Sequence, residues 1–257
     1  MKRRMIAWVA VLCLIVRLLP TVAMAAEDEK MAGTTPNTPI VATGENGWLV
    51  ESENGYMLYG ISASKVAAWF KEHSDYNGQL YISAVISKDI DTIVPYAMTS
   101  MNTDLKADNG AVIDGHNSFT IVKVDFSKNE WIGLIGDHAF FNCSEMEGTL
   151  DLSASPIMME IGDYAFYGCS KLSGTLCINT SYEYPLQTIG DYAFYGCTSL
   201  EGVDFSKVSN SGLKEIGDYA FYGCESLKTF IWPYYGEDTV IGDSAFENCT
   251  ALRTMCK

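Results

Sequence analysis

The sequence is poor in histidine and in basic residues. Only three histidines occur among 257 residues, and Lys and Arg number 17 against 32 for Asp and Glu. His73, His116 and His138 are far apart in the chain, and no HExxH or nucleophile-elbow motif accompanies them. An acidic surface repels phosphate backbones and anionic lipids. We therefore expect no enzymatic activity, and neither nucleic acid nor a membrane surface as a partner.

Only one apolar run is long, and it lies at the N-terminus. The basic residues Lys2, Arg3 and Arg4 precede it, and the small-residue site Ala23-Met24-Ala25 follows it. A run from Met5 to Val16 is too short to span a bilayer, and the pattern is typical of a cleaved secretory signal. Residues 1–26 are therefore predicted to be a signal peptide, and the mature chain to be secreted or held at the cell surface without membrane insertion. Residues 27–46, rich in Thr, Pro, Gly and Asn, are predicted to be a flexible linker.

One phrase occurs five times without gaps in the second half of the chain. It reads Ile-Gly-Asp-x-Ala-Phe-x-x-Cys, with Asn or Gly before the cysteine, and it begins at Ile135, Ile161, Ile189, Ile216 and Ile241. Successive cysteines are 26, 28, 27 and 25 residues apart, a period typical of stacked leucine-rich coils. A short alternating strand follows each copy, so each unit is predicted to be one strand plus one helical turn. A sixth, degenerate copy begins at Ile93, with Met98 in place of Phe and Met101 in place of Cys.

Each position of the phrase has an expected structural role. The aspartate is predicted to cap the N-terminus of a short helix, and the Asn or Gly before the cysteine to adopt the left-handed conformation that ends it. The alanine permits close approach to the sheet, and the phenylalanine fills the interior of the coil. Stacking in register at about 4.8 Å would turn each position into a continuous ladder.

Seven cysteines remain after the predicted signal is removed. Five share one repeat position, namely Cys143, Cys169, Cys197, Cys224 and Cys249. Stacked Cβ vectors run parallel at about 4.8 Å, whereas a disulfide needs convergent vectors and Cβ atoms about 3.8 Å apart. We therefore expect buried thiols that face backbone carbonyls, and no metal or cofactor, since no CxxC pair supports zinc. Cys177 and Cys256 are expected at outward-facing strand positions.

The chain before the repeats has its own signals. Trp48-Leu-Val and Tyr56-Met-Leu-Tyr flank a hairpin turn at Glu53-Asn-Gly55, and Ser64 is predicted to cap an apolar helix. Because a solenoid needs its first coil covered, residues 47–92 are predicted to be an N-terminal cap and residues 93–257 the solenoid. An insertion, Leu105 to Ser118, interrupts the degenerate coil. With Asp114 and His116, it is the one place where the sequence leaves room for an enzyme site.

The phrase Ile-Gly-Asp-Tyr-Ala-Phe-Tyr-Gly-Cys-x-x-Leu, followed by a strand, resembles the BspA-like class of bacterial leucine-rich repeat over about Ile93 to Cys256. The resemblance implies an α/β fold, a right-handed leucine-rich-repeat solenoid with a parallel β-sheet on the concave side and short helices on the convex side. It also implies a secreted or surface-exposed protein used for attachment, with no catalytic residues common to the family.

Two groups of residues are candidates for a ligand-binding surface. Outward-facing strand positions differ from coil to coil, whereas the turn phrase hardly changes, and recognition needs such variation. Tyrosines that follow two of the strands are expected on one rim beside the sheet, either as binding residues or as loop packing. The candidate ligand-binding residues are Tyr182, Tyr184, Tyr234, Tyr235, Thr175, Asp204, Thr229 and Ile231.

The sequence thus predicts a secreted or cell-surface leucine-rich-repeat binding protein. Its expected partner is an extracellular protein or glycan, in adhesion to host proteins, glycans or other cells. The alternative is a structural or self-assembling surface protein that associates with itself through an uncapped C-terminal coil.

Overall fold

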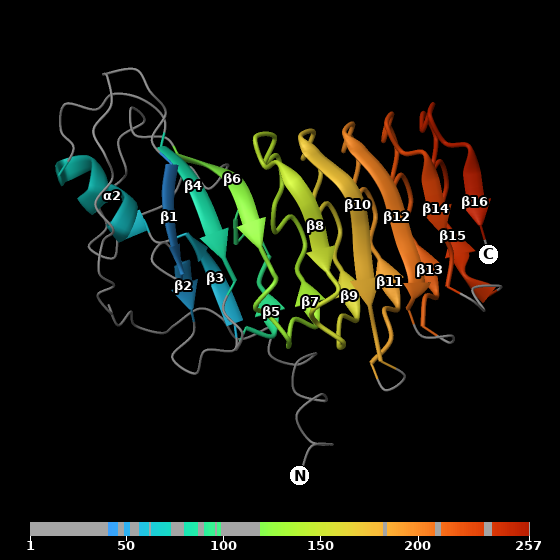
Figure 1. Ribbon diagram of the computed structural model, residues 1–257, viewed down its shortest axis with the longest axis horizontal. Helices are drawn as coiled ribbons and strands as arrows, with labels where there is room; N and C mark the ends of the chain where they lie inside the picture. Colours follow the sequence, from blue (N-terminus) through green and yellow to red (C-terminus); the bar gives the residue numbers. More distant parts are fainter. Residues whose placement is uncertain are drawn as a thin grey trace, which may run out of the picture. The chain divides into compact units, whose positions relative to one another are not determined.

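A computed structural model of the chain describes residues 41–45, 49–51, 57–61, 63–72, 80–86, 90–95, 97–98, 119–181, 184–208, 212–233 and 238–256 (Figure 1). The predicted signal peptide, Met101 and the insertion from Leu105 to Ser118 lie outside these residues. No helix in the described part of the chain is long and apolar enough to cross a membrane.

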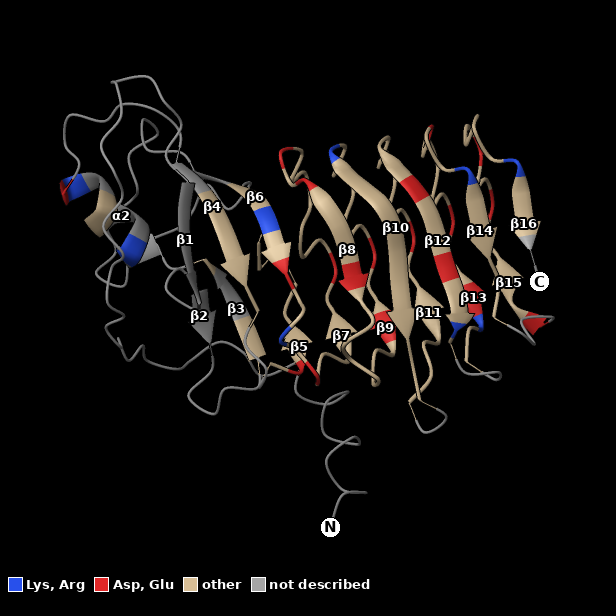
Figure 2. Cartoon of the chain, viewed as in Figure 1, with Lys and Arg blue, Asp and Glu red and all other residues tan. Residues whose placement is uncertain are grey.

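The repeats form a β-solenoid in which each coil contributes one strand to each of two sheets (Figure 1). The longer strands pair in parallel as a five-stranded sheet of β8 (Gly148–Leu152), β10 (Leu172–Asn179), β12 (Leu200–Lys207), β14 (Thr229–Ile231) and β16 (Thr254–Cys256). These strands carry few charged residues, among them Asp151 on β8 and Asp204 on β12 (Figure 2).

The second sheet consists mainly of two-residue strands at the start of each phrase. Its parallel members are β5 (Thr92–Ile93), β7 (Leu134–Ile135), β9 (Glu160–Ile161), β11 (Thr188–Ile189), β13 (Glu215–Ile216) and β15 (Val240–Ile241). Sequence analysis predicted one strand in each unit and missed these, because two residues are too few to show a period.

The N-terminal part of the described chain continues the second sheet and adds a third. Strands β2 (Leu49–Glu51) and β3 (Met57–Ile61) form the predicted antiparallel hairpin, and β3 pairs in parallel with β5. Strands β1 (Val41–Glu45), β4 (Leu80–Val85) and β6 (Phe119–Asp125) form a three-stranded parallel sheet. Five residues of the predicted linker therefore form a strand. The role of residues 47–92 as a cap stays a prediction.

The predicted helix before the repeats is present as α2 (Ala63–Glu72). It begins before Ser64, so this serine lies inside the first turn and does not cap the helix as predicted.

The degenerate sixth coil is confirmed, because Ile93 pairs with Ile135 in the same register as Ile135 with Ile161. The amide of Met98 donates to the carbonyl of Ala139 at 2.7 Å, as that of Phe140 donates to Ala165, so Met98 occupies the phenylalanine position.

The short helices predicted on the convex side are absent from the five described phrases, and that prediction is wrong. The segment after each Ile-Gly forms successive turns. Alternate amides donate to the next coil, as Phe140 does to Ala165 at 2.7 Å, while the amides between them close turns within the coil, as Phe141 does to His138 at 3.0 Å. A left-handed residue follows each aspartate, with φ of 55 to 57° at His138, Tyr164, Tyr192, Tyr219 and Ser244. Since a right-handed helix cannot include this conformation, the backbone turns instead.

The left-handed residues before the cysteines are confirmed. They are Asn142, Gly168, Gly196, Gly223 and Asn248, with φ of 56 to 71°. Glycine and asparagine are the residue types that adopt this conformation at the lowest cost. The residue type before each cysteine therefore predicted the left-handed backbone correctly, although this residue ends a run of turns and not a helix.

The aspartates of the phrase link neighbouring coils, and the prediction that they cap helices is wrong. The Oδ1 atom of each aspartate accepts the backbone amide of the aspartate in the next coil, at 2.9 Å for Asp137 to Asp163, then 2.8, 2.7 and 2.6 Å along the ladder. This contact explains the glycine that precedes the aspartate. A Cβ atom on Gly190 would lie 2.3 Å from Oδ1 and 2.6 Å from the amide nitrogen of Asp163, so only glycine fits.

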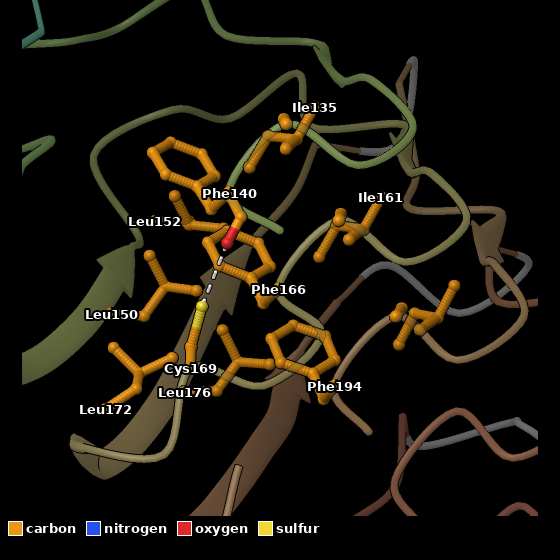
Figure 3. Close-up of a cluster of buried hydrophobic side chains, with 14 of the residues drawn as sticks. Ile135, Phe140, Leu150, Leu152, Ile161, Phe166, Cys169, Leu172, Leu176 and Phe194 are labelled. Carbon is orange, nitrogen blue, oxygen red and sulfur yellow. Dashed lines mark hydrogen bonds between the residues drawn. The ribbon is translucent and has the colours of Figure 1, made fainter. Parts of the chain in front are cut away.

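The phenylalanines form the predicted ladder inside the solenoid. Rings of Phe140, Phe166, Phe194, Phe221 and Phe246 stack nearly parallel, with centroids 4.9, 5.1, 5.1 and 5.4 Å apart. The first four are fully buried. Figure 3 shows three of these rings between leucines of β8 and β10 and the isoleucines of β7 and β9. The core is therefore continuous from coil to coil.

The five repeat cysteines form the predicted ladder of free thiols. Each Sγ donates to a carbonyl of the preceding coil, from Cys143 to Met98 at 3.3 Å through to Cys249 to Phe221 at 3.1 Å; Figure 3 shows the bond from Cys169 to Phe140. Four of the five are buried, and Cys249 is half-buried. Burial raises the pKa of Cys143 to about 12 and that of Cys197 to about 12, so the thiols are neutral.

We expect the phenylalanine ladder to contribute more stability than the aspartate ladder. Phe194→Ala leaves a cavity between two rings and should lower the free energy of unfolding by about 3–5 kcal/mol. Asp191→Ala leaves the amide of Asp218 without its 2.7 Å acceptor and should cost about 1–2 kcal/mol. Urea denaturation followed by circular dichroism measures both.

Asp191→Asn is the matched control, because it keeps an oxygen at the Oδ1 position. Its cost should be smaller than that of Asp191→Ala. Equal costs for the two substitutions would show that the bond to Asp218 contributes nothing.

The raised cysteine pKa values predict a loss of stability in alkali. A thiol whose pKa is higher in the folded than in the unfolded chain stabilises the fold fully below the unfolded pKa, and this contribution is lost as pH rises toward the folded value. Between about pH 9 and about pH 12, each of the buried thiols Cys143, Cys169 and Cys197, whose pKa values are raised, should lower the free energy of unfolding by up to about 1.4 kcal/mol per pH unit. The double variant Cys169→Ala, Cys197→Ala should show a shallower decline. Identical slopes in urea denaturation at pH 9 and 10 would contradict this account of the ladder.

Candidate ligand-binding face

The outward side chains of β8, β10, β12 and β14 form a surface that we call the five-stranded face, after its sheet. Burial alternates along these strands. In β10, Leu176 and Ile178 are buried, while Cys177 between them is partly exposed. In β12, Val203 and Phe205 are buried and Asp204 is partly exposed. The pleat therefore fixes which residues a ligand on this face can contact.

Four of the eight predicted site residues lie together on this face. The register pairs Thr175 with Gly202 and Gly202 with Thr229, which places one row across three strands. A second row runs from Cys177 to Asp204 and on to Ile231. Thr175, Asp204, Thr229 and Ile231 thus lie in two adjacent rows of one sheet, and their role in binding stays a prediction.

A glycine lies between the two threonines of the first row. A Cβ atom at Gly202 would lie 2.9 Å from the Oγ1 atoms of both Thr175 and Thr229. The two hydroxyls therefore lean over the backbone of Gly202 from either side. Because the neighbouring coils carry threonine at this position, the glycine makes this part of the face differ in shape from the rest.

The face is acidic on either side of an uncharged strand. Figure 2 shows β10 without charged residues between the acidic segments of β8 and β12. Asp151 and Asp204 are the register neighbours of Cys177. Burial raises the pKa of the Cys177 thiol, the two carboxylates raise it further, and Lys207 opposes them. The field at the centre of the face therefore disfavours anions and favours cations.

Both carboxylates are held in place by the backbone. Asp151 Oδ1 accepts the amide of Ser153 at 2.9 Å, and Asp204 Oδ1 accepts the amide of Ser206 at 2.9 Å. A ligand that bonds to these aspartates therefore meets groups that are already oriented, which lowers the entropy lost on binding.

The predicted tyrosine rim falls mostly outside the described residues. Tyr182, Tyr234 and Tyr235 are not described, and Tyr184, half-buried, lies in the loop after β10. The arrangement of the four tyrosines thus lies outside the described residues, and the rim stays a prediction.

Sequence analysis missed an exposed aromatic residue in the loop after β6. Trp131 is 53% exposed. Its amide donates to Oδ1 of the buried Asn129 at 3.1 Å, and Asn129 Nδ2 donates to the carbonyl of Ile90 at 2.8 Å. The sequence did contain a signal for this loop. Val124 to Lys128 has the same five residues as Val203 to Lys207, so the loop that follows it is equivalent to the loop after β12.

The turn side of the solenoid carries two stacks of aromatic rings. Stacked rings in the first are His138, Tyr164, Tyr192 and Tyr219, with centroids 4.7, 4.7 and 4.9 Å apart. In the second they are Phe141, Tyr167, Tyr195 and Tyr222, at 5.0, 4.8 and 4.9 Å. The ring faces are covered by their neighbours, so these residues pack coils together and leave mainly ring edges to a ligand.

Groups suited to catalysis or metal binding do not gather in the described part of the chain. No cluster of three or more His, Cys, Asp or Glu side chains there could hold a metal ion. His138 takes the place of a tyrosine in its stack, as predicted. His73, His116 and Asp114 lie outside the described residues.

Comparison with known proteins gives a family match and two similar structures. The model of the BspA type leucine rich repeat region matches six copies over residues 116–253. A leucine rich cell surface protein from Faecalibacterium prausnitzii A2-165 is 20% identical, with a TM-score of 0.44 over 90% of this chain and 55% of that chain. A leucine-rich repeat protein from Bacteroides ovatus ATCC 8483 is 16% identical, with a TM-score of 0.24 over 90% of this chain and 81% of that chain.

The chain thus spans about half the length of the Faecalibacterium protein. No curated protein matches it in sequence. Since the family match covers more than half of the chain, the chain belongs to the BspA-type leucine-rich-repeat family.

Proposed function

We propose that this protein is exported and binds an extracellular protein through the five-stranded face, in adhesion to host proteins or to other cells. The observation that carries the proposal is the contrast between the two sides of each coil. On the turn side, the same residues recur in register and contact one another. On the five-stranded face, Thr175, Gly202 and Thr229 share one row, and Cys177, Asp204 and Ile231 the next. Among the described coils, this face changes more from coil to coil than the turn side does, so it is the surface better able to encode specificity.

The chemistry of the face favours a ligand with basic residues. Asp151 and Asp204 lie on either side of the hydroxyls and the neutral thiol of β10, and the excess of acidic residues in the whole chain adds to this field. Complementary charge steers association and selects partners. Trp131, exposed in a loop beyond β6, has the residue type that most often supplies binding energy at protein interfaces.

Export is supported by the N-terminal sequence. The basic start, the apolar run and the small-residue site in residues 1–26 have the pattern of a secretory signal. Membership of the BspA-type family fits a location outside the cell or at its surface.

Neutralising the two aspartates should weaken binding selectively. Asp151→Asn with Asp204→Asn keeps an oxygen for each backbone amide but removes both charges, so the fold should be retained. We expect the affinity for basic extracellular-matrix proteins, immobilised on a sensor, to fall at least tenfold, about 1.4 kcal/mol. The loss should shrink at high salt, where exposed charges are screened.

Glu147→Gln with Glu225→Gln is the matched control. It makes the same change in net charge at exposed positions outside the strands of the face and should leave affinity nearly unchanged. An equal loss of affinity in both double variants would show that the net charge of the chain matters and the position of the two aspartates does not. If the chain binds neutral glycans and none of the basic proteins, and if this affinity is the same with and without the two aspartate substitutions, the ligand is a glycan and not the proposed protein.

A further inference from the structure

The turn side of the solenoid presents six tyrosine hydroxyls that packing does not use. They belong to the two ring stacks and lie on three successive coils, at Tyr164, Tyr167, Tyr192, Tyr195, Tyr219 and Tyr222. The hydroxyls are open to solvent and make no hydrogen bond to another described residue. Phe141 stacks on Tyr167 at 5.0 Å without a hydroxyl, so the stack needs the ring and not the oxygen. We call the six tyrosines the tyrosine platform.

The platform is a regular and rigid array. Along each stack the tyrosine centroids are 4.7 to 4.9 Å apart, and within each coil the two rings are 5.7 Å apart. Because neighbouring rings hold one another in place, a ligand that bonds to the hydroxyls orders little that is not already ordered. Desolvation and the neighbouring tyrosines raise the pKa of Tyr192 and that of Tyr195, so these hydroxyls stay protonated and can both donate and accept.

A carboxylate accompanies the two hydroxyls of each coil. Asp163, Asp191 and Asp218 directly precede the first tyrosine of their coils, and the Oδ1 atom of each accepts the amide of the next coil. The second oxygen of each carboxylate remains as an acceptor for a ligand. After desolvation and the neighbouring rings, the charges of Asp191 and Asp218 also raise the pKa of Tyr192, so carboxylates and hydroxyls share one surface.

These groups define the chemistry of a ligand. Carboxylates accept hydrogen bonds and repel anions, so the ligand must be a donor and must not be acidic. A surface that repeats in every coil discriminates poorly between single epitopes, but it makes the same contacts again along a polymer of identical units. A neutral polysaccharide meets both requirements, because each of its sugar units carries hydroxyls that donate and accept.

We infer that the tyrosine platform binds a linear neutral polysaccharide that runs along the two ring stacks. Its hydroxyls bond to those of the tyrosines and to the carboxylates beside them. Because the ring faces are covered by their neighbours, each sugar unit contributes little, and affinity comes from the number of coils that are contacted at once. The platform shares no residue with the five-stranded face, so this site does not depend on the function proposed for that face.

Affinity electrophoresis of the purified chain tests the inference. The gels contain amylose, xylan, mannan or a mixed-linkage β-glucan, and heparin serves as the anionic polymer. A neutral polysaccharide of this panel should retard the chain, and heparin should not. The hexasaccharide of that polymer should bind about tenfold more tightly than its monosaccharide, since only the longer ligand contacts several coils. Retardation by none of the neutral polymers, or equal retardation by heparin, would overturn the inference.

Phenylalanine substitutions separate binding from packing. The quadruple variant Tyr164→Phe, Tyr167→Phe, Tyr192→Phe, Tyr195→Phe removes four hydroxyls and keeps every ring. Its free energy of unfolding should be retained, while its affinity for the polysaccharide should fall about tenfold, since hydrogen bonds are lost. Tyr184→Phe, in the loop after β10, is the matched control and should bind as the wild type does. Wild-type affinity in the quadruple variant would contradict the proposed site.

The double aspartate variant of the five-stranded face distinguishes the two sites. Asp151→Asn with Asp204→Asn should leave retardation by the polysaccharide unchanged, whatever its effect on binding to basic proteins. Loss of retardation in this variant would move the polysaccharide to the five-stranded face and overturn the inference. Failure to bind basic proteins, with retardation intact, would instead refute only the function proposed for that face.

Discussion

The distance between two hydrogen-bonded parallel strands sets every other contact in this solenoid. Strands pair at about 4.8 Å, and side chains at equivalent positions must meet their copies at that spacing or a little more. Phenylalanine rings do so by stacking at 4.9 to 5.4 Å, thiols by donating to the carbonyl of the preceding coil, and aspartates by accepting the amide of the following one. A residue at one of these positions must therefore pack against the equivalent residue of the next coil at that spacing.

The same constraint accounts for the unusual backbone of the turns. A tyrosine in the left-handed region costs on the order of 1–2 kcal/mol, yet Tyr164, Tyr192 and Tyr219 all adopt it. In return, the amide of Tyr164 donates to the carbonyl of Asp191 at 2.8 Å, and its ring stacks on that of Tyr192 at 4.7 Å. Strain within one coil is thus offset by contacts between coils, which are available only when the phrase is repeated.

Sequence reasoning found the ladders because identity at a fixed period is visible in the letters, and it found the left-handed Asn142 and Gly168 because residue type reports backbone conformation locally. It failed on the turns because an aspartate before an alanine and a phenylalanine is equally suited to capping a helix and to bonding across coils. What decides is whether the amide of Phe166 reaches Ala193, a contact that lies far along the chain. For the candidate site, the alternation of the strands was enough to place Thr175 and Asp204 on the outward side, whereas the approach of two threonine hydroxyls over Gly202 depends on the register of three strands.

Register also divides the surface between stability and recognition. Positions whose side chains contact their own copies above and below cannot vary independently, since changing one leaves two neighbours without a match. Outward positions of β8 to β14 are linked by the backbone and not by side-chain identity, so threonine, glycine, cysteine, aspartate and isoleucine all occur there. The sheet tolerates such differences because its hydrogen bonds do not depend on the side chain, apart from proline. A solenoid of this kind can therefore vary the residues of the five-stranded face while the ladders that hold it together stay the same.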